Sequence, residues 1–306
     1  MRLIEVLIRR RSSLNSFRDT HAHQLRELRF ILHQLRRSPL SLAGIGIILT
    51  LVCLAVFAPY IAPYPGDAFY DMHPDKKLLA PQKGHWLGTD DFGRDMLSRI
   101  VFGTRLSLMI GIYVTGLAVM VGVPLGAIAG LSGGRLDEVI MRVTDIFLSF
   151  PPLVLAMAIS AALGPNLINA IIAISVTWWP WYTRIVRGQT LSLREQPFIE
   201  VARALAVSKR RIVFRHLIPN SLAPVTVQAS LDVGYAILWT AALSFVGLGA
   251  KPPVAEWGLM IAIGRRYLPD SWWYATSPGL AIMITVLGFN LLGDGLRDVL
   301  DPRLRR

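Results

Sequence analysis

The chain has 306 residues, of which 53% are hydrophobic and 17% are charged, and its mean hydropathy is +0.47. Soluble domains carry about 25% charged residues, so this composition excludes an ordinary soluble domain and indicates a membrane protein. The net charge of +12 does not indicate a nucleic-acid-binding protein. The arginines lie in blocks beside apolar segments and do not form one basic module with interleaved aromatic residues, which is typical of membrane topology signals.

Residues 1–39 are predicted to form a cytoplasmic N-terminal segment. Within it, five apolar residues recur at helical spacing, namely Leu25, Leu28, Ile31, Leu32 and Leu35. Arginines lie elsewhere on the same helix. This pattern predicts an amphipathic helix that lies in the membrane interface. The alternative is a basic linker that only determines the topology of the chain.

Residues 40–306 are predicted to form a transmembrane domain. A helix needs about 20 mainly apolar residues to cross a bilayer. Six stretches meet this requirement: 40–62, 104–131, 143–163, 167–186, 219–248 and 278–296. Backbone in lipid must be hydrogen-bonded internally, and these runs lack the alternation of a β-barrel. The predicted fold class is therefore an all-α polytopic membrane protein with six transmembrane helices.

Positively charged residues predict the orientation of these spans. Nine arginines lie in 1–39, eight Lys and Arg in 184–216, and four arginines in 297–306. Because cytoplasmic loops are enriched in Lys and Arg, we expect these three segments on the cytoplasmic side, with both termini inside. The loops at 63–103 and 249–277 are then external.

The first external loop contains the charged stretch LGTDDFGRDMLSR, residues 87–99. A helix is predicted to start here, capped by Thr89 or Asp90, and to lead along the external surface into the second span. The arginines of the stretch are available for its other aspartates, namely Arg94 and Arg99 for Asp91 and Asp95. The acids of this stretch are predicted to be structural first and docking contacts second.

The loop 187–218 is the predicted cytoplasmic coupling loop. Pro197 suits the first turn of a helix, and apolar residues after it recur at helical spacing. Ser208 is a suitable N-cap for a second, basic helix that ends at Pro219. Two short helices joined by a bend would present small residues and one acid, Glu200, to a groove on a soluble partner.

Four motifs, in order along the chain, resemble those of a known family. Glu200-Val201-Ala202, followed by Ala206 and Ile218-Pro219, resembles the Glu-Ala-Ala, Gly and Leu-Pro pattern in the cytoplasmic loop of ABC importer permeases. LGTDDFGRDMLSR, GLGAKPPVAEWGLM at 247–260 and FNLLGDGLRDVLDPRL at 289–304 resemble signatures of the dipeptide/oligopeptide/nickel permease family. The chain resembles the C-type permease subunit of that family, and VQASLDVGYAIL resembles its D,D-dipeptide branch.

The resemblance implies an ABC type I transmembrane domain in the inner membrane of a bacterium. Such a subunit forms a heterodimer with a paralogous B-type permease and imports di- or oligopeptides. Two cytoplasmic ATPases would supply the energy and hold ATP and Mg²⁺, and an external solute-binding protein would deliver the peptide. No cofactor, metal or catalytic residue is expected in this chain, and its sequence has no GxxxxGK[ST] loop to hold phosphates.

The resemblance also implies that the loop around Glu200 contacts the ATPase. The predicted coupling residues are Glu200, Val201, Ala202, Arg203, Ala204, Leu205, Ala206 and Ser208. Ala206 stands where the family prefers glycine, and alanine has less backbone freedom than glycine to form a tight bend.

Three residues are candidates for the translocation pathway: Asp232, Asp145 and Trp181. An acid inside a membrane span is a functional candidate because its desolvation is costly. Asp232 either faces the pathway, where it would meet the amino group of a peptide, or hydrogen-bonds a neighbouring span. Asp145 either takes part in gating or forms a structural ion pair with Arg142 or a partner. Trp181 belongs to an aromatic run that either anchors the span at the interface or stacks on a peptide.

The external region is where the solute-binding protein is expected to dock. The candidates for docking contacts come from both external loops: Asp90, Asp91, Arg94, Asp95, Glu256 and Trp257. For the pair in the second loop, a packing role is the other prediction.

Two other classes of protein compete with the importer. A secondary transporter or channel driven by an ion gradient would need no ATPase, and only Asp232 favours it. A membrane enzyme would use a metal site in the first external loop. That loop has only two histidines, His73 and His85, without the short regular spacing of metal ligands, so this class is disfavoured.

Overall fold

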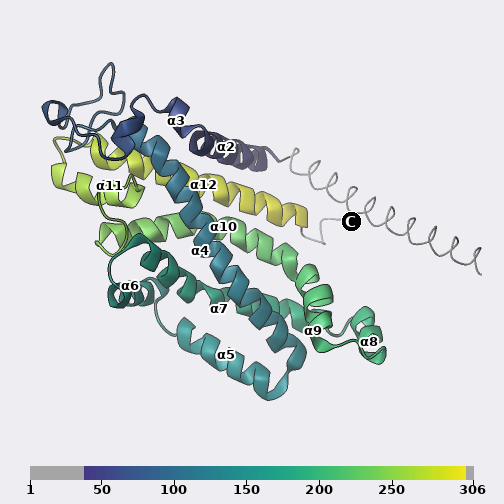
Figure 1. The fold of residues 1–306 in the computed structure, drawn as a ribbon. Helices are drawn as coiled ribbons and strands as arrows, with labels where there is room; N and C mark the ends of the chain where they lie inside the picture. The colour runs from purple at the N-terminus through teal and green to yellow at the C-terminus, as the bar shows by residue number, and fades with distance from the viewer. Residues whose placement is uncertain (1–37, 301–306) are drawn as a thin grey trace, which may run out of the picture.

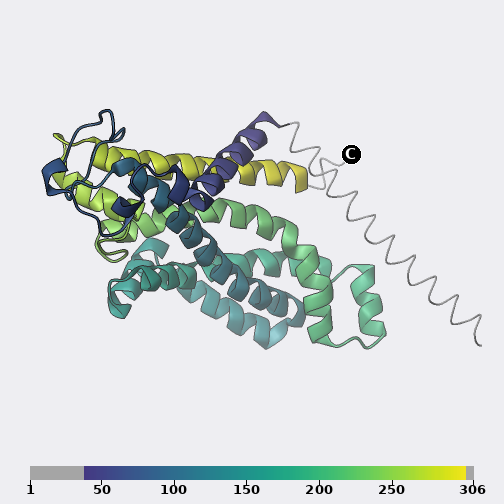
Figure 2. The ribbon, with the colours of Figure 1, turned by 45° about the horizontal axis from the view of Figure 1, so that its top comes forward.

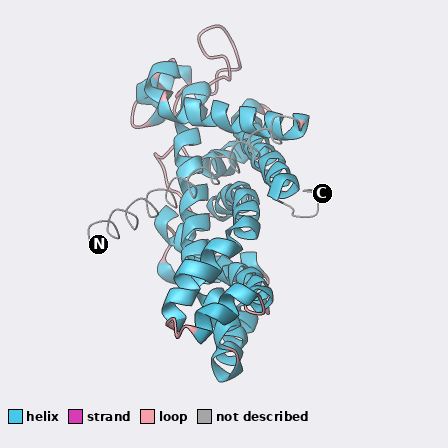
Figure 3. Cartoon of the chain, turned by 90° about the vertical axis from the view of Figure 1, so that its right-hand side faces the viewer, coloured by secondary structure: helices cyan, strands magenta, loops and turns pink. Residues whose placement is uncertain are grey.

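The computed structural model describes residues 38–300, and within this range it consists of helices and loops without a β-strand (Figures 1 and 3). The long helices are α2 (Pro39–Val56), α4 (Met96–Ser132), α5 (Gly134–Leu148), α6 (Pro152–Leu163), α7 (Leu167–Leu193), α10 (Ile218–Phe245) and α12 (Trp273–Leu300). The short ones are α3 (Ala58–Ile61), α8 (Pro197–Ala204), α9 (Lys209–Ile212) and α11 (Trp257–Gly264). A π-helix, η3 (Val213–Leu217), joins α9 to α10, and the 3₁₀-helices are η1 (Pro65–Ala68), η2 (Pro74–Lys76) and η4 (Arg265–Tyr267). The predicted amphipathic helix lies outside the described residues.

Helix α4 is the centre of the bundle and packs most extensively along α7 (Figure 2). Glycines on α4 allow the two helices to approach closely. A Cβ on Gly126 would lie 2.5 Å from the Thr183 carbonyl oxygen, and one on Gly122 would meet the Trp179 carbonyl oxygen. Because small residues let helix backbones approach in a membrane, this seam holds α4 and α7 together by van der Waals contact.

A second group of helices covers the other side of α4. Helix α10 packs against α12 and α4, and α12 packs against α2. The seam between α2 and α12 also uses glycine, because a Cβ on Gly44 would lie 2.7 Å from the backbone nitrogen of Leu292. The result is an elongated bundle with two ends, the α8 end, where α8 and α9 lie, and the α11 end, where α11 and the loop after α3 lie (Figure 1).

Among residues 38–300, three helices are long and apolar enough to cross a membrane, namely α2, α4 and α12. The stretch 143–163, predicted as one span, is broken into α5 and α6 with a bend of 87°. Proline explains the break: Pro151 and Pro152 lack backbone donors, and the residue before a proline avoids the helical conformation. If this bent pair is one span, the count is four. Helices α7 and α10, with 27 and 28 residues, are long enough to cross a membrane but are not among these apolar helices. The number of six spans therefore stays a prediction.

The start of α4 also differs from the prediction. The helix begins at Met96, where the Asp95 side chain accepts a hydrogen bond from the Ser98 nitrogen at 2.8 Å. Neither Thr89 nor Asp90 is the cap, because the Asp90 carboxylate accepts from the backbone nitrogens of Phe92 and Arg94 and so closes a loop instead. The helix therefore reaches into the expected external loop 63–103, and the connecting segment ends at residue 95.

Candidate functional site

Helix α8 projects from the α8 end as a small hairpin with α9 (Figure 2). Pro197 is at its first turn, as the sequence predicted. Ile199 and Ala202 are buried, at 0% and 7% exposure, and hold the helix to the bundle. The opposite face, which includes Glu200 and Val201, is exposed. The predicted acid is therefore available to a partner.

A bend at Ala206 ends α8. The Ala206 nitrogen donates to the Arg203 carbonyl and the Val207 nitrogen donates to the Ala202 carbonyl, both at 2.9–3.0 Å, which is a Schellman motif. The residue at the centre of such a motif takes a left-handed conformation, and Ala206 has φ of 54°. Glycine is usual here because a Cβ makes this conformation costly, by about 1–2 kcal/mol.

The second predicted coupling helix is not a separate element. It begins at Lys209 and continues without a break through η3 into α10. Ser208 is at its N-cap position, but its side chain makes no capping hydrogen bond. Ile212, Val213 and Leu217 are buried in the main core, so this elbow is packed against the bundle. The prediction of two short helices joined by a bend is therefore corrected to one short helix, α8, followed by the extended start of α10.

A cleft of about 480 Å³ lies between α7 and α10, next to the break between α5 and α6. Its walls are formed by apolar and aromatic side chains with one acid: Pro152, Trp178, Trp181, Ile185, Gln228, Asp232, Tyr235 and Trp239. Asp232 and Trp181, two of the three predicted pathway residues, thus share one cleft. Trp181 is 49% exposed, whereas Trp178 is packed edge-to-face on Trp239.

Both oxygens of Asp232 are engaged. The Tyr182 hydroxyl donates to Oδ2 at 2.6 Å, and the Gln228 amide donates to Oδ1 at 2.9 Å. Asp232 therefore hydrogen-bonds a neighbouring helix, which was one of the two alternatives, and it also lines the cleft; its place on the translocation pathway stays a prediction. Gln228 was missed by the sequence reasoning, although its spacing of four residues from Asp232 places both on one face of a helix.

The third predicted pathway residue, Asp145, lies elsewhere. Its Oδ1 accepts from Arg184 of α7 at 2.6 Å, and Arg142 pairs instead with Glu138 at 3.4 Å. The predicted pair with Arg142 is wrong because Arg142 and Glu138 are one turn apart on α5, whereas Asp145 faces α7. Asp137 makes a second bridge to α7, with Arg187 at 2.6 and 2.7 Å. These ion pairs join α5 to α7.

The α11 end contains a buried network of charged residues. Arg94 Nε donates to Asp90 Oδ2 at 2.7 Å, and Arg99 Nε lies 3.4 Å from the same oxygen. Asp90 is 0% exposed and both arginines are 2% exposed. The expected pairing of these arginines with Asp91 and Asp95 is therefore wrong, because the loop turns back and encloses Asp90 between them.

The neighbouring acids of this loop have separate partners. Asp95 accepts from Ser98 and lies 3.0 Å from His85 Nδ1, so His85 is held by a carboxylate. Asp91 is half-buried and accepts from the Tyr274 hydroxyl at 2.7 Å. No cluster of three or more potential metal ligands occurs among residues 38–300. The acids of this loop thus bind other side chains of the protein and hold the loop in shape.

Glu256 and Trp257 are also buried. The Glu256 carboxylate caps α11 by accepting from the nitrogens of Gly258 and Leu259 at 2.9 and 2.7 Å. Burial raises the pKa of this carboxyl, and the hydrogen bonds oppose that rise. Trp257 is 1% exposed and its indole donates to the Ile100 carbonyl at 3.2 Å. The bond from Trp257 joins α11 to α4.

Five of the six residues predicted for external docking are thus enclosed within the protein, and Asp91 is half-buried. The exposed residues of the same end include four aromatic side chains: Phe69, Tyr70, Trp86 and Trp272. The sequence motif therefore marks the residues that hold the loop in shape, and the exposed residues come from its less patterned parts.

Long apolar helices packed side by side are typical of an integral membrane protein. The model of the binding-protein-dependent transport system inner membrane component family matches residues 122–306, and that of the N-terminal transmembrane domain of oligopeptide transport permease C matches residues 28–81. The chain belongs to this family of ABC importer permeases, as its motifs predicted.

Several curated relatives align with most of the chain. It is 46% identical to a probable D,D-dipeptide transport system permease of Escherichia coli K12, and the alignment covers 88% of this chain and 89% of the relative. It is 46% identical to a dipeptide transport system permease of Alkalihalophilus pseudofirmus, with 89% and 88% covered. A glutathione transport system permease of Pectobacterium atrosepticum is 41% identical, with 89% of each chain covered.

A solved structure confirms the fold. A chain of the MetNI methionine ABC transporter, in an inward-facing form, superimposes with a TM-score of 0.53 at 20% identity, covering 67% of this chain and 97% of that chain. The fold class is therefore the type I importer transmembrane domain, as predicted.

Proposed function

We propose that this chain is the permease subunit of an ATP-driven importer of short peptides in the inner membrane of a bacterium. The observation that carries the proposal is the 46% identity, over nearly nine-tenths of the chain, to permeases of dipeptide and D,D-dipeptide transport systems. The cleft that contains Asp232 supports a peptide substrate, because a carboxylate in an aromatic cleft matches the ammonium group and side chains of a peptide.

In this proposal the α8 end is cytoplasmic and α8 contacts the ATPase. The exposed face with Glu200, at the tip of the bundle, supports this role. ATP and Mg²⁺ would be held by two ATPase subunits, while this chain and a paralogous permease form the pathway. An external solute-binding protein would dock at the α11 end.

The continuous helix from Lys209 to Phe245 supports a mechanism for coupling. A movement of α8 passes through the bend at Ala206 to the start of this helix, and α10 carries Asp232 on the wall of the cleft. A rigid element that joins two distinct sites is what coupling between them requires. Closure of the ATPases would thus tilt α10 against α7 and open or close the cleft.

Purification of the chain from its host in mild detergent, followed by reconstitution, tests the proposal. We expect an ATPase and a second permease in the purified complex, and peptide uptake into proteoliposomes that stops without ATP. Uptake that persists without ATP and follows an imposed ion gradient would instead show a secondary transporter.

A further inference from the structure

The cleft that contains Asp232, which we call the upper chamber, continues toward the α8 end as a second cleft, the lower chamber. The lower chamber has a volume of about 580 Å³, and its lining includes Gln189, Asn220 and Arg297. Ile185 and Gln228 line both chambers. The two chambers therefore form one groove.

This groove follows one face of each of two helices. On α10 its lining residues recur every three or four positions, at Asn220, Pro224, Gln228, Asp232, Tyr235 and Trp239. On α7 they recur every four positions, at Trp181, Ile185 and Gln189. Residues three and four apart lie on the same face of a helix, so each helix contributes one continuous wall. From residue 220 to residue 239 the α10 wall is roughly 28 Å long.

The two chambers contain opposite charges. Among the described residues that line them, Asp232 is the one acid and Arg297, in the last turn of α12, is the one cation. Arg297 is exposed and forms no ion pair within residues 38–300, where its neighbours Asp294 and Asp298 are exposed as well. The lining of the groove is thus acidic in the upper chamber and basic in the lower one.

Contacts between α10 and α12 place Arg297 along the groove. A Cβ on Gly234 would lie 3.2 Å from the Val286 Cα, and one on Gly293 would lie 2.5 Å from the Leu231 Cδ2. Because the contact moves back along α10 as it moves forward along α12, the two helices are antiparallel. Arg297 is about one helical turn beyond Gly293, so it lies about one turn from Leu231, toward the start of α10.

This placement gives the separation of the two charges. Arg297 and Val227 both line the lower chamber, and Val227 is five residues from Asp232 along α10. Five residues correspond to roughly 7.5 Å along a helix. An extended peptide of two residues spans at most about 7 Å. The distance between the acid and the cation therefore suits the two charged ends of a peptide of two or three residues.

We propose that the lower chamber is a subsite for the C-terminal carboxylate of a short peptide, with Arg297 as its ligand and the amino group of the peptide near Asp232. A guanidinium group matches both oxygens of a carboxylate. Gln189 and Asn220 offer amide groups to the peptide backbone. This inference rests on the proposed function, because it assigns one end of the proposed substrate to one part of the same groove.

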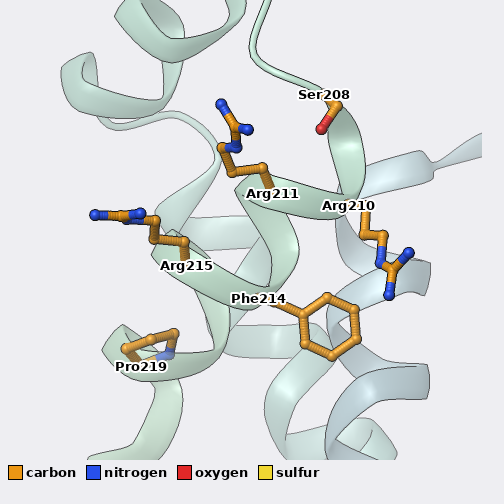
Figure 4. A pocket seen from close by; sticks show the side chains of 6 residues that line it. All are labelled: Ser208, Arg210, Arg211, Phe214, Arg215 and Pro219. Carbon is orange, nitrogen blue, oxygen red and sulfur yellow. The ribbon is translucent and has the colours of Figure 1, made fainter.

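A second basic region of the protein lies outside this groove. Figure 4 shows the pocket at the elbow between α8 and α10, with Arg210, Arg211 and Arg215. These arginines belong to the loop 187–218, which was predicted to contact the ATPase, and none of them lines either chamber. Arg297 comes from α12 instead, so its role is separable from that of the coupling loop.

The test measures binding of radiolabelled alanyl-phenylalanine and of its C-terminal amide to the whole importer complex in nanodiscs. The solute-binding protein is left out, so that the permeases alone select the ligand. We expect Arg297→Gln to weaken binding of the free acid about tenfold, the usual effect of losing a hydrogen bond to a charged group. Binding of the amide should not change, because it has no carboxylate. Arg297→Lys keeps the charge but not the fork and should have an intermediate effect.

A matched control removes one positive charge from the same end of the bundle. Arg135 is exposed at the start of α5, outside the groove, and Arg135→Gln should bind both ligands as the wild type does. Equal loss of both ligands in Arg297→Gln would overturn the subsite. So would unchanged binding of both ligands, with or without weaker assembly of the complex, because Arg297 would then serve a partner subunit or the fold.

The proposed function is tested separately on the wild type. ATP-driven uptake of alanyl-phenylalanine, with the solute-binding protein restored, is measured beside binding. Uptake by the wild type without detectable binding to the permeases would overturn the subsite and leave the proposed function intact. Uptake that does not depend on ATP would contradict the proposed function itself.

Discussion

The Tyr182 hydroxyl donates a hydrogen bond of 2.6 Å to Oδ2 of Asp232, and this bond joins α7 to α10. Gln228 engages the other oxygen, so the carboxylate is held in one orientation on the wall of the cleft. A polar side chain at membrane depth is stabilised when its hydrogen bonds are satisfied. The acid is therefore positioned in advance of any substrate.

Replacement of Asp232 by asparagine is expected to reduce uptake of a peptide with a free amino group about tenfold, because a hydrogen bond to a charged group contributes about 1.5–3 kcal/mol. Asparagine can still accept from Tyr182, so the fold should persist. Uptake into proteoliposomes, compared with that of the amino-acetylated peptide, measures the effect.

Tyr182→Phe is the matched control, since it removes one hydrogen bond and keeps the carboxylate. It should reduce uptake less than Asp232→Asn. Equal uptake by Asp232→Asn and the wild type would show that the acid serves only to hold α7 against α10.

The replacement Ala206→Gly is expected to stabilise the α8 bend by about 1 kcal/mol, because glycine adopts a positive φ without a clash. Thermal unfolding of the detergent-purified complex checks this. Ala204→Gly, two residues earlier in α8, should act in the opposite sense because glycine disfavours a helix. If both variants destabilise the protein, the bend at Ala206 does not have the left-handed conformation.

Truncation of Asp90 should destabilise the protein by about 3–5 kcal/mol, because Asp90→Ala leaves two buried arginines without their carboxylate. Asp75→Ala, an exposed acid of the same segment, should change stability by less than about 0.5 kcal/mol. Thermal unfolding of both variants distinguishes a structural acid from a docking contact. A stable Asp90→Ala protein that fails only to bind the solute-binding protein would contradict the buried network.

The raised pKa of Glu256 predicts a dependence of stability on pH. The ordinary value is 4.5 and burial raises it in the folded protein, so the folded state binds the proton more tightly than the unfolded state. The contribution of protonated Glu256 to the stability of the folded protein is fully present below pH 4.5 and is lost as the pH rises through the pKa of Glu256 in the folded state. Glu256→Gln keeps the acceptor for the cap of α11 and should flatten this dependence in unfolding scans at several pH values. A wild-type profile identical to that of the variant would refute the shift.

Local patterns in the sequence predicted the elements that depend on local physics. Pro197 begins α8, and the pair Pro151–Pro152 stands where the third apolar run is broken. The size of the bend, 87°, and the pairing of the α5 acids with α7 could not be predicted, because hydropathy averaged over a window shows neither.

Partners of charged residues could not be read from spacing. Asp90, Arg94 and Arg99 lie within ten residues, yet the pairing depends on how the loop from 63 to 95 folds over the start of α4. Asp145 was expected to form an ion pair with Arg142 or a partner, and the residue with which it pairs, Arg184, is 39 residues away along the chain. Such contacts are set by the packing of helices, for which no short-range pattern exists.

The replacement Glu200→Arg tests the central claim most directly, because it reverses the charge on the exposed face of α8 through which ATP hydrolysis is proposed to drive transport. We expect ATPase attachment to the purified permease to weaken about tenfold or more, with normal membrane insertion, since repulsion between like charges at an interface costs several kcal/mol. Glu195→Arg, an exposed acid just before α8, is the control and should bind the ATPase as the wild type does. Full attachment and ATP-driven uptake in Glu200→Arg would contradict the assignment of α8 as the coupling helix.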